Sequence, residues 1–323
     1  MRVISVNPVL DLELRQRSRT MRSMLVITIY LLFLIGVMWL AYQASTFNTG
    51  FTNNPLESLT TKAGRTTFEW LLVTQLAILM LVVPAISAGV ISGERDRQTL
   101  IPLQVTLLGP VQIFFGKVAA AVSFTLLLLV SSAPLLVVPF LLGGVTLVEI
   151  LATLGVLLFL GLITSVIGVS CSAVFRRTQV AALVAFASVF ALCVGSLVLF
   201  GATAAIDGMR GTDSAYPRVP PMWFNPITPL ASVGGDLGNS SFIQVDAPLS
   251  LIDRGFTSLE LGGDVFIDQT GRAFDQRTGE EIEIDRDLIP LWLKSMLTLS
   301  ALASFMAWIG IRKLRLPQQV LSL

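Results

Sequence analysis

The chain has 323 residues, of which 54% are hydrophobic and 13% are charged. An ordinary soluble domain has about 25% charged residues, so a lipid bilayer must solvate much of this chain. Its net charge of +1 argues against a nucleic-acid partner, and the absence of histidine removes the commonest general base and metal ligand.

The first segment, residues 1–23, is polar and amphipathic, unlike the brief apolar run of a cleavable signal peptide. Asn7 can cap a helix with Pro8 in its first turn, and Glu13 and Arg15 fall on the polar side of that helix. We predict a helix in the inner membrane interface, with its arginines facing lipid phosphates. An ordinary basic flank before the first span is the alternative.

Residues 24–206 contain five apolar runs, and residues 291–323 begin with a sixth. A helix needs about 20 apolar residues to cross roughly 30 Å of hydrocarbon, so each run can span a membrane. We therefore predict an all-α integral membrane protein of six spans, kinked at Pro84, Pro134 and Pro139. The predicted spans are Met24–Ala44, Phe68–Ile91, Val118–Leu142, Val148–Phe175, Val180–Ile206 and Leu291–Ile311.

Arginine and lysine are concentrated in segments that six spans would place on one side of the membrane. These are the N-terminal stretch, the loop that ends at Lys117, the turn at Arg176 and Arg177, and the tail after residue 311. Positive charge marks the cytoplasmic side, so we predict that both termini are cytoplasmic.

The segment 207–290 differs in kind from the spans, with 14 acidic and 6 basic residues and many glycines and prolines. We predict that it lies outside the membrane and that Pro217–Val233 rests on or dips into the outer surface. Alternation of polar and apolar residues predicts short strands around Val265–Asp268, Ala273–Gln276 and Ile282–Asp285. No ligand spacing of a calcium-binding loop is present, so we expect a solvated acidic surface and no metal site.

The loop after the second span combines charge with an apolar face. Glu94, Arg95 and Arg97 come first, and Gly109 with Pro110 ends the pattern. We predict an amphipathic helix over residues 93–108 that suits docking to a cytoplasmic protein, with an interfacial loop as the alternative. The apolar face consists of Leu100, Ile101, Leu103, Val105 and Leu107.

Three stretches together resemble the permease subunits of ABC exporters of the type-two class. They are Asn7–Arg15, which matches an NP…ELR start, the run Ile91–Leu100 with its Thr-Leu pair, and the Gly-Lys pair at Lys117. The run Thr106–Gly109 departs from the family because it lacks a proline. The resemblance covers spans one to five, and residues 207–290 have no counterpart in it.

The resemblance implies partners and a mechanism. Two permeases, identical or related, would pair in a bacterial plasma membrane, and two ATPase subunits that bind ATP and Mg would dock beneath them. Each coupling helix would sit in a cleft of an ATPase, while Glu13 and Arg15 brace the same junction. The ATPase-coupling residues that the resemblance implies are Glu94, Arg95, Arg97, Thr99, Leu100, Ile101 and Leu103.

The chain itself has no phosphate-binding loop, because the glycine and lysine spacing before Val118 does not fit one. We expect no catalytic residue and no bound cofactor, so the energy would come from the partner. Small residues that let helices approach closely are candidates for a seam between two permeases, with packing inside one bundle as the alternative. These candidates are Gly161, Ser165 and Gly195.

Three other functions are alternatives. A channel or secondary carrier usually needs ionisable groups in mid-membrane, whereas Glu69 and Glu149 fall at the outer ends of spans, where we expect water to reach them. A membrane enzyme would lack an evident general base. A permease-like subunit that passes ATPase closure to an extracytoplasmic partner, without transport, remains open because of the segment 207–290.

Overall fold

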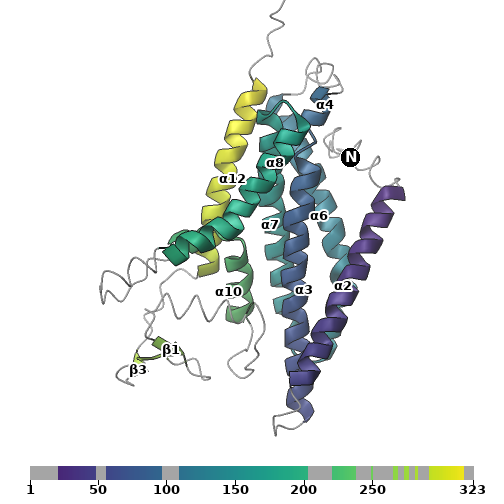
Figure 1. Cartoon of the computed structure of the whole chain (residues 1–323), viewed down its shortest axis with the longest axis vertical. Coiled ribbons are helices and arrows are strands. Elements are labelled where there is room, and N and C mark those ends of the chain that lie inside the picture. Colours follow the sequence, from purple (N-terminus) through teal and green to yellow (C-terminus); the bar gives the residue numbers. More distant parts are fainter. Residues whose placement is uncertain are drawn as a thin grey trace, which may run out of the picture.

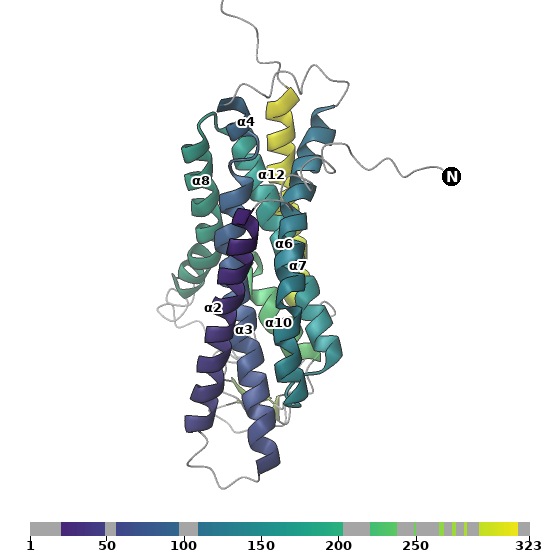
Figure 2. The ribbon, with the colours of Figure 1, turned by 90° about the vertical axis from the view of Figure 1, so that its right-hand side faces the viewer.

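Helices that run along the long axis dominate the molecule (Figure 1). The computed structural model describes residues 21–48, 56–96, 109–202, 220–237, 249, 265–267, 273–275, 281–282 and 291–315. Viewed after a quarter turn, the same helices lie side by side as one elongated bundle (Figure 2). The long helices are α2 (Met21–Asn48), α3 (Leu56–Ser87), α6 (Pro110–Leu141), α7 (Leu147–Val174) and α12 (Leu291–Arg315).

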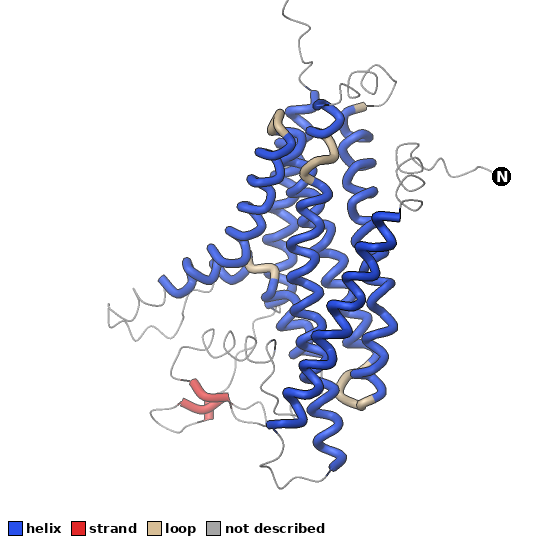
Figure 3. The backbone as a smooth tube through the Cα atoms, turned by 45° about the vertical axis from the view of Figure 1, so that its right-hand side comes forward, coloured by secondary structure: helices blue, strands red, loops and turns tan. Residues whose placement is uncertain are grey.

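A further long helix is interrupted by a π-turn. It begins as α8 (Thr178–Phe190), passes through the π-helix η2 (Ala191–Gly195) and continues as α-helix to Ala202. In Figures 1 and 3 this helix leans away from the others along its second half. With it, six helices among the described residues are long and apolar enough to cross a membrane, in agreement with the predicted number of spans.

The second and third long helices begin well before the predicted spans. Helix α3 starts at Leu56, and Arg65 and Glu69 pair across one of its turns close to the start of the apolar run. Helix α6 starts at Pro110, a residue suited to a first helical turn. Membrane-spanning helices therefore extend beyond the windows that hydropathy selects.

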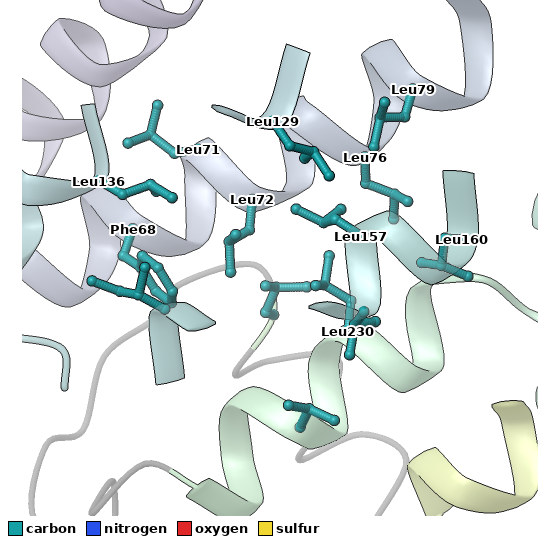
Figure 4. Close-up of a cluster of buried hydrophobic side chains, with 14 of the residues drawn as sticks. Phe68, Leu71, Leu72, Leu76, Leu79, Leu129, Leu136, Leu157, Leu160 and Leu230 are labelled. Carbon is teal, nitrogen blue, oxygen red and sulfur yellow. The ribbon is translucent and has the colours of Figure 1, made fainter. Parts of the chain in front are cut away.

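A short helix enters the bundle between two long ones. The 3-10 helix η3 (Pro220–Phe224) leads into α10 (Ile227–Leu237), which packs against α7 and α12. Leu230 of α10 is fully buried and belongs to the same apolar cluster as Leu72 and Leu157 (Figure 4). The stretch expected at the outer surface thus reaches into the protein core.

The entering segment is anchored on both neighbours by polar contacts. Hydroxyls of Ser295 and Thr298 on α12 donate to the carbonyl of Trp223, at 3.0 and 2.7 Å. The amide of Asn225 donates to the carbonyl of Cys193 in the π-helix at 3.3 Å, while its Oδ1 accepts the N–H of Ile227 at 2.9 Å. One buried side chain therefore starts α10 and holds the helix that leans away.

Substituting Asn225 with alanine is expected to lower the free energy of unfolding by about 1–2 kcal/mol, because it removes both contacts of a fully buried side chain. Asn225→Ser is the matched control, since serine can still cap a helix but is too short to serve both partners. Thermal unfolding in detergent should rank wild type, serine and alanine in that order. An alanine variant as stable as wild type would contradict these contacts.

Three short strands form an antiparallel sheet in the order β1-β2-β3, drawn in red in Figure 3. They are β1 (Val265–Ile267), β2 (Ala273–Asp275) and β3 (Glu281–Ile282). Phe266 pairs with Phe274, and Ala273 with Ile282. All three strands lie in or beside stretches with alternating polar and apolar residues.

Buried apolar side chains form two main clusters along the bundle. One joins α2, α3, α6, α7, α10 and α12, and the other joins the end of α3, the start of α6, α8, and the distal parts of α7 and α12. Many apolar side chains on the outside remain exposed, as expected where lipid is the solvent. Examples are Leu25, Leu32, Trp39, Leu40, Leu151, Leu183, Phe190 and Phe305.

The turn from α6 to α7 lies directly against α3. Gly143 has a φ of +78°, a left-handed conformation that favours glycine. A Cβ on Gly144 would lie 2.4 Å from the backbone nitrogen of Arg65 and 2.5 Å from the carbonyl oxygen of Thr61. Only a glycine lets the two backbones approach so closely.

Candidate coupling site

The predicted coupling segment begins as a short helix, α4 (Ser92–Asp96), shortly after α3 ends. In Figures 1 and 2, α4 lies at the end of the bundle where α8 begins and α12 finishes. The rest of the predicted helix, with Arg97, Thr99, Leu100, Ile101 and Leu103, lies outside the described residues. The same holds for the predicted N-terminal helix, with Asn7, Pro8, Glu13 and Arg15.

A buried serine of α7 holds the junction between α3 and α4. Ser172 Oγ accepts the N–H groups of Ile91 and Ser92, each at 2.9 Å, and donates to Ser92 Oγ at 3.2 Å. Both serines are fully buried. The start of α4 is therefore fixed to α7 through its backbone, and no signal in the sequence pointed to Ser172.

Glu94 and Arg95 of α4 contact the bundle. Lys117 Nζ forms an ion pair with Glu94 Oε1, and the lysine side chain is only 4% exposed against 27% for the glutamate. Arg95 Nη2 donates to the carbonyl of Ala173 at 3.5 Å. These contacts tie α4 to α6 and α7, and they give Glu94 and Arg95 roles within the chain beside any partner contact.

Lys117 was not among the residues predicted for coupling. The sequence marks it as part of a Gly-Lys pair at the start of a span, and positive charge there explains it as an inner flank. Helix α6 begins earlier than predicted, at Pro110, so Lys117 lies inside the helix rather than before it. A buried lysine needs a counterion, which is the signal that could have linked it to Glu94.

A second charged cluster, Arg65–Glu69–Glu149, lies near the opposite end of the bundle. Arg65 Nε donates to Glu69 Oε1 at 3.0 Å, and Arg65 Nη1 donates to Glu149 Oε1 at 2.6 Å. Both glutamates are 1% exposed, so the expectation that water reaches them is wrong. The apolar runs of the sequence do not indicate that Arg65 pairs with both carboxylates in the protein interior.

Every carboxylate oxygen of this cluster has a partner within the chain. Glu69 Oε2 accepts the backbone N–H of Leu249 at 3.0 Å. Glu149 Oε2 accepts from both the N–H and the hydroxyl of Thr146, in a capping box at the start of α7. Among the described residues, no group of His, Cys, Asp or Glu could hold a metal ion.

The predicted seam residues divide into two kinds. A Cβ on Gly161 would lie 2.4 Å from Thr125 Cγ2 of α6, and Ser165 is fully buried with its hydroxyl donating to the carbonyl of Gly161. Packing inside one bundle, the alternative, therefore accounts for both residues. Gly195 is exposed and lies in the π-helix, so it alone of the three faces outward.

The class of protein follows from these features: the chain is a multi-pass helical membrane protein whose described charged clusters lie near the two ends of its bundle. Comparison with protein-family models and with curated proteins finds no match.

Proposed function

We propose that this chain is the membrane subunit of an ATP-driven exporter, a permease that moves its substrate outward with energy from a separate ATPase. The position of α4 carries the proposal. It follows α3 directly, its start is held by Ser172 of α7, and Glu94 is paired with Lys117 of α6. A force applied to the segment that follows α4 would reach three spans at once.

The mechanism requires partner subunits that supply the movement. Two ATPase subunits would bind ATP and Mg and close on each other, and each would hold one coupling segment, residues 93–108. The apolar residues Leu100, Ile101 and Leu103 would fill the ATPase cleft, while Glu94 and Arg95 transmit its movement to α6 and α7. The two kinds of contact have different roles, because apolar burial gives affinity and a partly buried ion pair gives a directional link.

The same proposal fixes the orientation. The end that carries α4 also carries Arg176, Arg177, Arg312 and Lys313, and positive charge favours the cytoplasmic side. Both termini would then be cytoplasmic, in a bacterial plasma membrane. A second permease, identical or related, would complete the translocation path, and Gly195 is the exposed small residue available for that contact.

The decisive experiment is purification of the tagged chain from its native membrane in mild detergent, with mass spectrometry of the proteins that follow it. We expect an ABC ATPase in a one-to-one ratio, and the presence or absence of a second permease decides between a heterodimer and a homodimer. A chain that emerges alone, or only with extracytoplasmic proteins, would overturn the proposal.

Substituting Lys117 with methionine is expected to uncouple the complex without dissociating it. Glu94 would lose its counterion, and a broken link of this kind weakens a contact by about 1.5–3 kcal/mol, or roughly ten- to hundredfold in the coupled equilibrium. ATPase copurification should persist, while stimulation of ATP hydrolysis by substrate should fall by at least tenfold.

Two controls separate coupling from binding. Leu100→Asp changes the proposed docking face and should abolish copurification of the ATPase. The exchanged pair Glu94→Lys with Lys117→Glu restores opposite charges and should recover part of the stimulation. If Lys117→Met and Leu100→Asp acted identically, or if neither changed stimulation, residues 93–117 would not be the coupling site.

A carrier driven by ions is less well supported. Its binding site would need ligand oxygens free to hold an ion, whereas both oxygens of Glu69 and of Glu149 are engaged by Arg65, Leu249 and Thr146. The Arg65–Glu69–Glu149 cluster therefore has the character of a structural network.

A further inference from the structure

Leu249 makes two contacts with the helices of the bundle. Its side chain is 3% exposed and belongs to the same apolar cluster as Phe68, while its backbone N–H donates to Glu69 Oε2. It lies 180 positions after Glu69 in the chain. Residue 249 belongs to the long segment that follows the fifth span.

The carboxylate that receives this N–H is held in place from its other side. Arg65 Nε binds Glu69 Oε1, and Arg65 also binds Glu149 Oε1 on α7, so the guanidinium fixes the orientation of Glu69. Glu149 is itself held by Thr146 through the capping box. Glu69 Oε2 is thus presented toward Leu249 as a fixed, charged acceptor in a site with almost no access for water.

We infer that Glu69 is the docking point that holds the segment after the fifth span on α3. Arg65 is the positioning residue that aims its carboxylate. The carboxylate of Glu69 binds the backbone N–H of Leu249, and the apolar cluster buries the leucine side chain. It joins α3 and α7 to a segment whose earlier part, η3 and α10, is anchored on α12. A displacement of α3 relative to α12 would therefore act on that segment at two separated points.

This inference stands apart from the proposed exporter, because it concerns contacts within one chain and needs no ATPase. Helix α3 nevertheless has α4 close to its other end. The two ends of one helix thus carry a contact for the candidate coupling segment and a contact for the extracytoplasmic segment. Either role can fail while the other holds.

The test is hydrogen exchange of the purified full-length chain in detergent, followed by mass spectrometry of a peptide that contains Leu249. Glu69→Gln is the informative variant. Its single amide oxygen is drawn to the guanidinium of Arg65, which leaves an NH₂ group facing the N–H of Leu249. Exchange at Leu249 should accelerate by tenfold or more, while peptides from the middle of α3 and α7 keep wild-type rates.

Glu149→Gln is the matched control. It places the same neutral amide on the other side of Arg65, where the amide oxygen can still accept from Nη1, and it leaves both contacts of Glu69 unchanged. We expect unchanged exchange at Leu249. Equal acceleration by both variants would mean that the cluster only stabilises the bundle, and no acceleration by Glu69→Gln would mean that Glu69 does not dock the segment. If Glu69→Gln fails to fold, Leu249→Ala, which keeps the backbone N–H, should still raise exchange at that peptide alone.

Discussion

Arg65→Met is expected to lower the free energy of unfolding by about 3–5 kcal/mol, the largest effect we anticipate from a single substitution. Arg65 is the counterion that the structure gives to two carboxylates that are 1% exposed. Without it, Glu69 and Glu149 would be two like charges in a site that excludes water. Thermal or denaturant unfolding in detergent would measure the loss.

Two further variants show whether charge is the cause. Arg65→Lys keeps the charge but not the planar fork that reaches both carboxylates, so we expect an intermediate loss. The triple variant Arg65→Met, Glu69→Gln and Glu149→Gln has no buried charge left in this cluster, and it should be more stable than Arg65→Met alone. A triple variant that is less stable than Arg65→Met would show that packing, rather than an uncompensated charge, dominates at this site.

The spans could be predicted from the sequence because a helix that crosses a bilayer needs a long run of apolar residues. The six helices confirm that prediction, although the runs missed the polar first turns of α3 and the first turns of α6. Arg65 and Lys117 lie in these additional helical stretches, and each is paired with a glutamate from elsewhere in the chain. In a hydropathy window such charged residues only lower the average, so the predicted span begins after them.

The long-range contacts that form the two charged clusters could not be predicted from one sequence. Glu149 lies 84 positions from Arg65, and Leu249 lies 180 positions from Glu69. Nothing local to either residue favours one partner over another. The same limit applies to Ser172, which looks like one more small residue in an apolar run until the start of α4 is placed against it.

Helix α10 was missed for a different reason. The helix is short, its residues are of mixed polarity and prolines lie close to it, so the sequence predicts a surface loop. The signal was present in Asn225, because asparagine followed by proline is a common start of a helix. Only the tertiary contacts with α7 and α12 turn that weak signal into a buried helix.

Gly144→Ala is expected to have the second largest effect on stability, roughly 1–3 kcal/mol or more, because the added methyl group would meet backbone rather than a side chain that can rotate. The backbone nitrogen of Arg65 and the carbonyl oxygen of Thr61 lie 2.4 and 2.5 Å from the new Cβ. Neither atom can move without shifting α3. The turn between α6 and α7 would have to withdraw from α3, and unfolding in detergent would measure the cost.

Gly155→Ala is the matched control, since its Cβ would have no heavy atom within 4 Å and alanine is the better helix former. It should leave stability unchanged or raise it slightly. Withdrawal of the turn would also carry Glu149 away from Arg65, because Gly144 lies close before the N-cap Thr146, which binds Glu149. Gly144→Ala and Glu149→Gln should therefore be less than additive in their loss of stability. Strict additivity would mean that the glycine contact and the ion cluster are independent, and a Gly144→Ala variant as stable as Gly155→Ala would contradict the close approach itself.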